Sequence, residues 1–94
     1  MEITKASMVE ATAGREKGKP FFVLETDGDY LLLADGKSRK IEAPKRKKRK
    51  HVRFLADGGG RVADKIRDRE RVTNSELRKA IAAYGGTDNS DREG

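Results

Sequence analysis

Short apolar stretches separated by tight turns fill the first half of the chain. Asp27-Gly28 and Asp35-Gly36 each lie between two such stretches. Asp-Gly pairs favour tight turns because both residues tolerate positive φ. We therefore predict five short strands, a spacing typical of a small antiparallel barrel. The predicted strands are residues 8–11, 21–25, 30–34, 38–42 and 51–55.

The predicted core follows from the faces of these strands. Because side chains alternate between the two faces, a shift of one residue in any strand would move its apolar side chains to the opposite side. The predicted core residues are Val9, Phe22, Leu24, Leu31, Leu33, Ile41, Val52 and Phe54. The fold class predicted for residues 1–55 is mainly β, a small antiparallel barrel of about five strands.

The pattern changes after three consecutive glycines at residues 58–60. Val62, Ala63 and Ile66 have helix-like spacing, but residues 67–71 are strongly polar. We therefore predict a weak or extended segment at residues 62–69, within a connector over residues 56–72. Thr73-Asn74-Ser75-Glu76 is a capping box, in which the Thr and Glu side chains each accept a hydrogen bond from the other's backbone amide. Apolar residues then recur at spacings of three and four, typical of one helix face. They are Leu77, Ala80, Ile81 and Tyr84.

Gly85 and Gly86 follow this face and are typical of a helix end. We therefore predict a C-terminal helix over residues 73–86. Residues 87–94 contain no large apolar side chain, so we predict a disordered tail.

Charge is distributed very unevenly along the chain. Of its 94 residues, 40% are charged and 34% hydrophobic, and the net charge is +6. The segment from Lys37 to Arg53 holds ten basic residues and one acid, Glu42, a net charge of +9, whereas the rest of the chain has −3. Residues 45–50 are six consecutive cations, which we expect to bulge from a hairpin before the last strand. The sequence thus describes a near-neutral body with one cationic strip.

A single-sign run needs counter-charge from outside itself, and a nucleic-acid backbone supplies it, with release of condensed counterions. This prediction depends on the cations lacking carboxylate partners within the protein. A solubility loop or a nuclear-import signal has the same composition. Aromatic platforms for stacking single-stranded bases are scarce and most are needed for the core, which favours structured RNA. The aromatic residues are Phe21, Phe22, Tyr30, Phe54 and Tyr84.

Nothing in the sequence points to catalysis. His51 is the sole histidine, and the turn explains Asp27 and Asp29. The glycine-bounded loop at residues 13–20 differs from a phosphate-binding loop, because its spacing is one residue short and Pro20 replaces the magnesium-binding hydroxyl. The chain has no cysteine, and no apolar stretch approaches the roughly 20 residues of a membrane span. We expect a cytoplasmic protein that is not an enzyme, binds no metal or cofactor, contacts no membrane and is monomeric when free.

The order of motifs in residues 6–55 resembles a KOW motif in an SH3-like barrel. The resemblance begins with the loop Ala13-Gly14-Arg15-Glu16-Lys17-Gly18-Lys19 and the apolar strand after it. It continues through the acidic turn, Tyr30-Leu31-Leu32-Leu33, Asp35-Gly36 and the basic region that ends at His51-Val52. This order is similar to the archaeal and eukaryotic large-subunit ribosomal protein family fourteen-e. The resemblance implies ribosomal RNA as the partner, Gly18 as a fixed loop glycine, and loop cations that touch RNA.

The sequence thus predicts a protein that binds structured RNA, such as ribosomal RNA in ribosomal particles. The alternatives are a protein-interaction module of the transcription or translation machinery, or a general polyanion or DNA binder. The predicted RNA-binding residues are Arg15, Lys17, Lys19, Lys37, Arg39, Lys40, Lys45, Arg46, Lys47, Lys48, Arg49, Lys50, His51 and Arg53.

Overall fold

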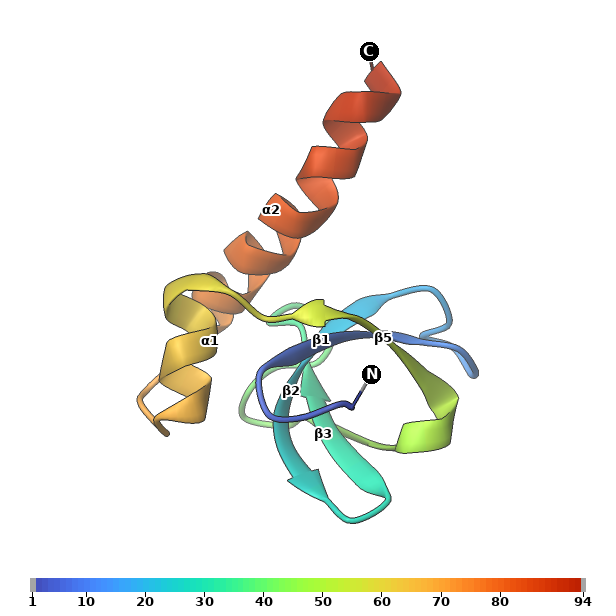
Figure 1. The fold of residues 1–94 in the computed structure, drawn as a ribbon, viewed down its shortest axis with the longest axis vertical. Coiled ribbons are helices and arrows are strands. Elements are labelled where there is room, and N and C mark those ends of the chain that lie inside the picture. Colours follow the sequence, from blue (N-terminus) through green and yellow to red (C-terminus); the bar gives the residue numbers. More distant parts are fainter. Residues whose placement is uncertain (1, 94) are drawn as a thin grey trace.

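Five antiparallel strands form a single curled sheet in the order β4-β3-β2-β1-β5, and two helices follow it along the chain (Figure 1). The computed structural model describes residues 2–93, and side chains as far as Tyr84. A short 3-10 helix, η1, joins the two edge strands of the sheet, as expected for a small barrel-like fold. The elements are β1 (Ser7–Ala11), β2 (Pro20–Asp27), β3 (Tyr30–Ala34), β4 (Lys45–Lys48), η1 (Arg49–His51), β5 (Val52–Asp57), α1 (Gly60–Arg67) and α2 (Asn74–Glu93).

Four of the five strand predictions are confirmed, and the prediction for residues 38–42 is wrong. Those residues form part of a loop in which the Asp35 carboxylate accepts hydrogen bonds from the backbone amides of Lys37 (2.9 Å) and Arg39 (2.8 Å). The same loop is bound to the start of α2, because the Asn74 side chain accepts the Ile41 amide at 2.8 Å. The fourth strand is instead the basic segment Lys45–Lys48, which pairs with β3 despite the poor strand propensity of lysine.

The sheet is buried on both faces at β2, which explains its four consecutive apolar residues. One buried cluster lies on the side away from the helices and contains Val9, Ala11, Phe21, Val23, Leu31, Leu33 and Val52. The other lies beneath α1 and α2 and contains Ala6, Met8, Phe22, Ala34, Ala63, Ile66 and Leu77. Of the predicted core residues, Leu24, Ile41 and Phe54 are half-buried and the other five are buried.

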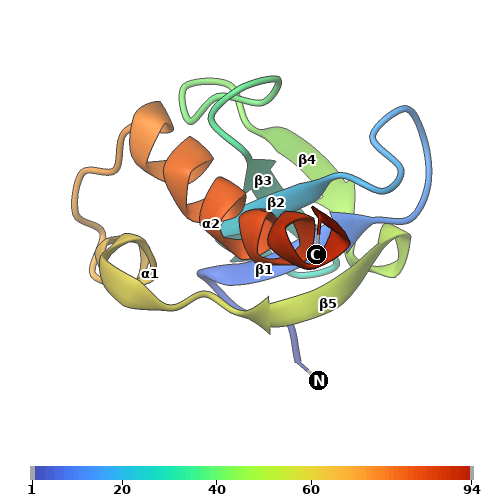
Figure 2. The same cartoon turned by 90° about the horizontal axis from the view of Figure 1, so that it is seen from above.

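Helix α1 occupies the region that we predicted as a weak or extended connector, so that prediction is wrong. The helix buries Ala63 and Ile66 in the cluster that contains Met8 and Phe22. These two residues lie three apart, on one side of the helix, while most of its other residues are polar. Burial of this narrow apolar face, rather than intrinsic propensity, stabilises a helix as short as this one. The start of α2 lies beside α1 at one side of the sheet, and the helix then runs on away from the strands (Figure 1 and Figure 2).

Helix α2 begins at the predicted capping box. The Thr73 hydroxyl accepts the Glu76 amide at 3.1 Å, and the Glu76 carboxylate accepts the Thr73 amide at 2.9 Å. Leu77 is fully buried, whereas Tyr84, which we placed on the same apolar face, is 40% exposed. Within the described part of the chain, no helix has the length and apolarity that a membrane span requires.

The end of α2 differs from our prediction. The helix continues through Gly85 and Gly86 to Glu93, so residues 87–93 are helical where we expected a disordered tail. Residue 94 lies outside the described residues. A glycine ends a helix when it adopts the left-handed conformation. Within a helix it costs about 1 kcal/mol relative to alanine, a penalty that a long helix tolerates.

Gly36 allows the loop after β3 to approach α2 closely, which predicts a specific cost for Gly36→Ala. Its φ is +80°, and an added Cβ would collide with the backbone carbonyl of Asn74. We expect a loss of about 2–4 kcal/mol of unfolding free energy from conformational strain and overpacking together. Gly28 is the matched control, because its φ is +60° but an added Cβ would meet nothing within 4 Å. Urea denaturation that gave equal losses for both alanine variants would contradict this close approach.

Candidate nucleic-acid interface

The six consecutive cations form an ordered strand and a 3-10 helix, not the bulging loop that we expected. Side chains alternate along β4, so Lys45 and Lys47 are half-buried on one side while Arg46 and Lys48 are exposed on the other. The register places Lys47 opposite Leu31 and Lys48 opposite Tyr30. The cations of β4 therefore form two sets with different surroundings. Lys45 and Lys47 form an inward set that points toward the rest of the protein, and Arg46 and Lys48 form an outward set that points toward solvent.

A buried carboxylate, Glu16, faces the inward set. It belongs to the β1–β2 loop, and its Oε2 accepts a hydrogen bond from Arg39 Nε at 2.6 Å and lies 2.5 Å from Nη2 of the same guanidinium in an ion pair. Lys47 Nζ lies 3.9 Å from the other carboxylate oxygen, Oε1. Glu16 thereby connects the basic loop to the basic strand. The sequence offered one signal for this role, a single acid within the loop Arg15-Glu16-Lys17, which we did not use.

The electrostatics at Glu16 favour its ionised form. Burial by itself would raise the pKa of Glu16. The hydrogen bond from Arg39 and the charges of Arg39, Lys45 and Lys47 outweigh burial and hold the pKa below its ordinary value of 4.5. One negative charge thus faces three positive charges. Even after this internal pairing, the neighbourhood retains a positive excess.

The β1–β2 loop has a fixed shape that displays its cations. Gly14 and Gly18 have φ values of +82° and +88°, in the region that favours glycine. The base of the loop is closed by hydrogen bonds from the Gly18 amide to the Ala11 carbonyl (2.8 Å) and from the Ala11 amide to the Lys19 carbonyl (3.1 Å). Glu16 is buried, while the three loop cations are exposed. These are Arg15, Lys17 and Lys19.

Several other arginines of the strip have internal partners. Arg49 Nε donates to the Gly28 carbonyl at 2.7 Å and its Nη1 donates to the Ile3 carbonyl at 2.9 Å.

Other cations of the strip have acidic partners. Arg53 pairs with Glu10 at 2.8 Å. Arg46 stacks 3.7 Å from the centre of the Tyr30 ring, with an exposed, 3.5 Å contact to Asp27. We had expected the cations of the strip to lack partners within the protein, but four of them pair with acidic side chains. These are Arg39, Arg46, Lys47 and Arg53.

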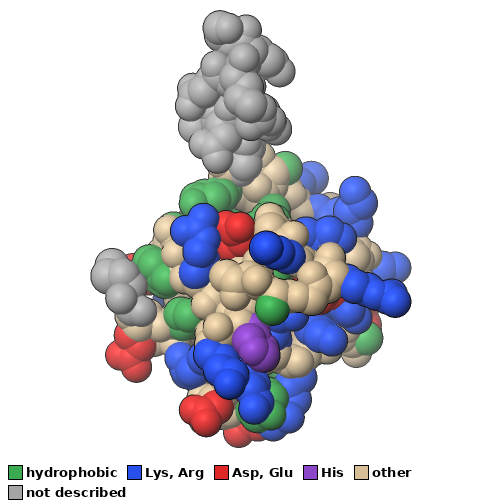
Figure 3. All heavy atoms as spheres, turned by 90° about the vertical axis from the view of Figure 1, so that its right-hand side faces the viewer, with side chains coloured by type: hydrophobic (Ala, Val, Ile, Leu, Met, Phe, Trp, Pro, Cys, Tyr) green, Lys and Arg blue, Asp and Glu red, His purple; other side chains and the backbone are tan. Residues whose placement is uncertain are grey.

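Of the remaining predicted cations, Lys45 is half-buried near Glu16 and the others are exposed, and none of them forms an ion pair within the part of the chain that the structure describes. The half-buried His51 accepts the Thr12 amide at 2.8 Å through its carbonyl, which holds η1 beside the start of the β1–β2 loop. Lys and Arg side chains cover much of the side of the molecule that carries η1 and this loop (Figure 3). We call the exposed set the basic face; it comprises Arg15, Lys17, Lys19, Lys37, Lys40, Lys48 and Lys50.

Arg49 and Lys50 are adjacent in the run but differ in their contacts, which predicts different effects of substitution. Arg49→Ala removes two charge-assisted hydrogen bonds that tie η1 to the β2–β3 turn and to the N-terminal segment. We expect it to lower the unfolding free energy by about 2 kcal/mol. Lys50→Ala, on an exposed side chain, should change stability by less than about 0.5 kcal/mol. Thermal denaturation of both variants checks this, and similar melting temperatures would show that Arg49 has no structural role.

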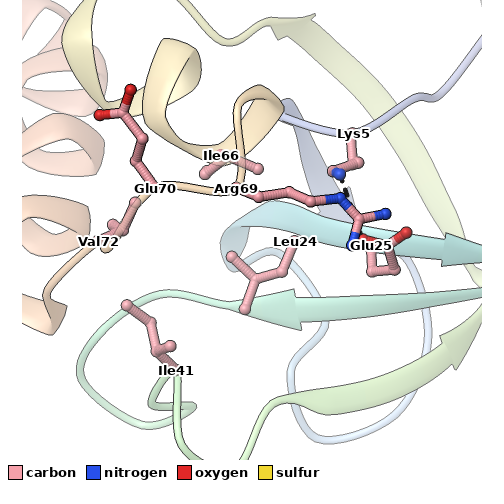
Figure 4. A pocket seen from close by; sticks show the side chains of 8 residues that line it. All are labelled: Lys5, Leu24, Glu25, Ile41, Ile66, Arg69, Glu70 and Val72. Atoms are coloured by element: carbon pink, nitrogen blue, oxygen red, sulfur yellow. Dashed lines mark ion pairs between the residues drawn. The ribbon is translucent and has the colours of Figure 1, made fainter.

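Other candidate chemistry is sparse in the described residues, which contain no cluster of three or more His, Cys, Asp or Glu side chains that could hold a metal. A cavity of about 230 Å³ lies between α1, β2 and the β3–β4 loop (Figure 4). Its walls include the aliphatic side chains of Leu24, Ile41 and Ile66, and Lys5 pairs with Glu25 at 3.5 Å. Unlike the basic face, this cavity has no excess of one charge.

Comparisons with known proteins add no functional assignment. A scan against protein-family models finds no match, and neither does a search of curated proteins. What can be inferred about function therefore comes from the surface and from the sequence.

Proposed function

We propose that this protein binds structured RNA through the basic face, that ribosomal RNA is its partner, and that it catalyses no reaction. The observation on which this rests most is the set of exposed cations that have no acidic partner in the described part of the chain. Phosphates of a nucleic-acid backbone would neutralise them and release counterions. Glu16 supports the same proposal, since it aligns the loop with the strand yet neutralises one charge among three cations.

Structured RNA is favoured over single strands by the lack of free aromatic platforms on the basic face. Arg46 and Lys48 lie over the Tyr30 ring, and Phe21 and Phe22 are buried. Duplex RNA is recognised mainly through phosphates and 2′-hydroxyls, for which lysine and arginine suffice. The resemblance of residues 6–55 to KOW domains of ribosomal proteins points to the same class of ligand.

Competition between nucleic acids at one fixed salt concentration tests the proposal. An RNA duplex and a DNA duplex of the same sequence carry the same charge but differ in shape and in 2′-hydroxyls. We expect the RNA duplex to bind at least about tenfold more tightly, and the protein to co-sediment with ribosomal particles until high salt removes it. Equal affinity for both duplexes would indicate a general polyanion binder. Absence of binding to either would refute the proposal.

A further inference from the structure

A groove at one end of the basic face connects it to helix α2. The groove has a volume of about 350 Å³ and lies between the β1–β2 loop, the β3–β4 loop and the first half of α2. Its lining combines cations with small or aliphatic side chains. The residues that matter here are Lys19, Pro20, Lys37, Arg78, Ile81 and Ala82.

Positive charge dominates this groove. Its one carboxylate, Asp35, already accepts hydrogen bonds from the Lys37 and Arg39 amides and from the Ser38 hydroxyl (3.0 Å). Lys19 and Lys37 are exposed and have no ion pair among the described residues. Arg78 Nη1 donates to the Gly36 carbonyl at 2.6 Å, which fixes the guanidinium beside the groove. A ligand that fits here must therefore carry negative charge.

The other wall is aliphatic. Pro20 and Ile81 are half-buried and Ala82 is exposed, so this wall presents hydrocarbon surface without a polar group that would need a partner. An anionic ligand that also has a flat, weakly polar face matches both walls. Nucleotides have this combination, since a base can stack on a guanidinium plane and pack against apolar side chains while its phosphate binds lysine.

We propose that this groove accepts an unpaired nucleotide of the RNA that binds the basic face, with its phosphate at Lys19 and Lys37 and its base between Arg78 and the aliphatic wall. The inference rests on the proposed function, because Lys19 and Lys37 belong to both surfaces. That continuity favours a nucleotide over an acidic peptide with an apolar side chain, which has similar chemistry. The protein would then recognise a duplex with a bulge or junction rather than a plain duplex.

Two RNA probes test this: a short blunt duplex, and the same duplex with one bulged nucleotide. Wild-type protein should bind the bulged probe about tenfold more tightly. Lys37→Ala should abolish most of that preference. Lys40→Ala is the matched control, since Lys40 lies in the same loop and is exposed but does not line the groove. Lys40→Ala should weaken the binding of both probes by the same factor and keep the preference for the bulged probe.

A second pair of variants tests the wall of α2 without altering a cation. Ala82→Glu places a negative charge in the groove and should remove the preference for the bulged probe. Ser75→Glu adds the same charge at an exposed position of the helix outside the groove and should leave the preference intact. Loss of the preference in both members of either pair, or no preference in the wild type, would overturn the groove proposal. NMR titrations give a further test. The groove proposal would also be overturned if an acidic peptide shifted the methyl resonances of Ile81 and Ala82 and bulged RNA did not. Failure of the blunt duplex to bind would instead refute the proposed function.

Discussion

Replacing Lys17, Lys48 and Lys50 with glutamine is expected to weaken binding to a structured RNA duplex by about a hundredfold near 0.1 M salt. These three cations are exposed on the basic face and take part in no ion pair among the described residues. If each neutralises one phosphate, the slope of log affinity against log salt should become less steep by about 2–3. Stability should change little, because exposed side chains away from special contacts contribute little to folding.

The control variant removes the same charge from the other side of the protein. Arg61, Arg71 and Lys79 are exposed residues of the helical part and form no ion pair in the described region. Replacing all three with glutamine should leave the slope within about one unit of the wild-type value. If both triple variants lost affinity equally, binding would depend on overall charge and the basic face would have no special role.

Glu16→Gln is expected to lower the unfolding free energy by about 3 kcal/mol, a large part of the 5–15 kcal/mol that stabilises a typical domain. The change removes the single negative charge that faces Arg39, Lys45 and Lys47, whose mutual repulsion would then be unopposed. Urea denaturation measures this loss. RNA affinity of the folded variant should not fall, since the substitution removes a negative charge from beside the basic face.

The stability of the wild type should also depend on pH through Glu16. Its folded-state pKa lies below the ordinary value of 4.5, so its stabilising contribution is complete above that value and is lost as the pH falls through the lowered folded pKa. Glu16→Gln should lack this part of the acid dependence. Glu2→Gln, at an exposed residue, should keep it. An acid dependence of stability that is identical in both variants would show that the ionised Glu16 carboxylate and the cations around it do not stabilise the fold.

Local chemistry in the sequence was sufficient to predict several elements. The Asp-Gly turns and the capping box at Thr73 each depend on residues a few positions apart, and the structure confirms the strands beside those turns and the start of α2. The strand at residues 38–42 was predicted wrongly because its residues bind the start of α2, more than thirty positions away in sequence. Contacts between distant segments have no local signature.

The candidate interface was predictable in composition but not in its pairing. The density of cations indicated the right part of the chain. Which cations are free depends on the register of β4 with β3 and on the path of the β1–β2 loop. Glu16 and Arg39 are 23 positions apart, and Glu10 and Arg53 are 43 apart, so neither pair can be recognised from spacing. The same holds for the groove, which α2 completes with Arg78 and Ala82.

A lysine-reactivity footprint tests the central claim most directly. The free protein and its complex with a structured ribosomal RNA fragment are acetylated briefly, and the modified lysines are quantified by mass spectrometry. RNA should protect Lys17, Lys19, Lys48 and Lys50 on the basic face and leave Lys65, on α1, and Lys79, on α2, as reactive as in the free protein. Protection concentrated on the helical side, with the basic face unchanged, would contradict the account.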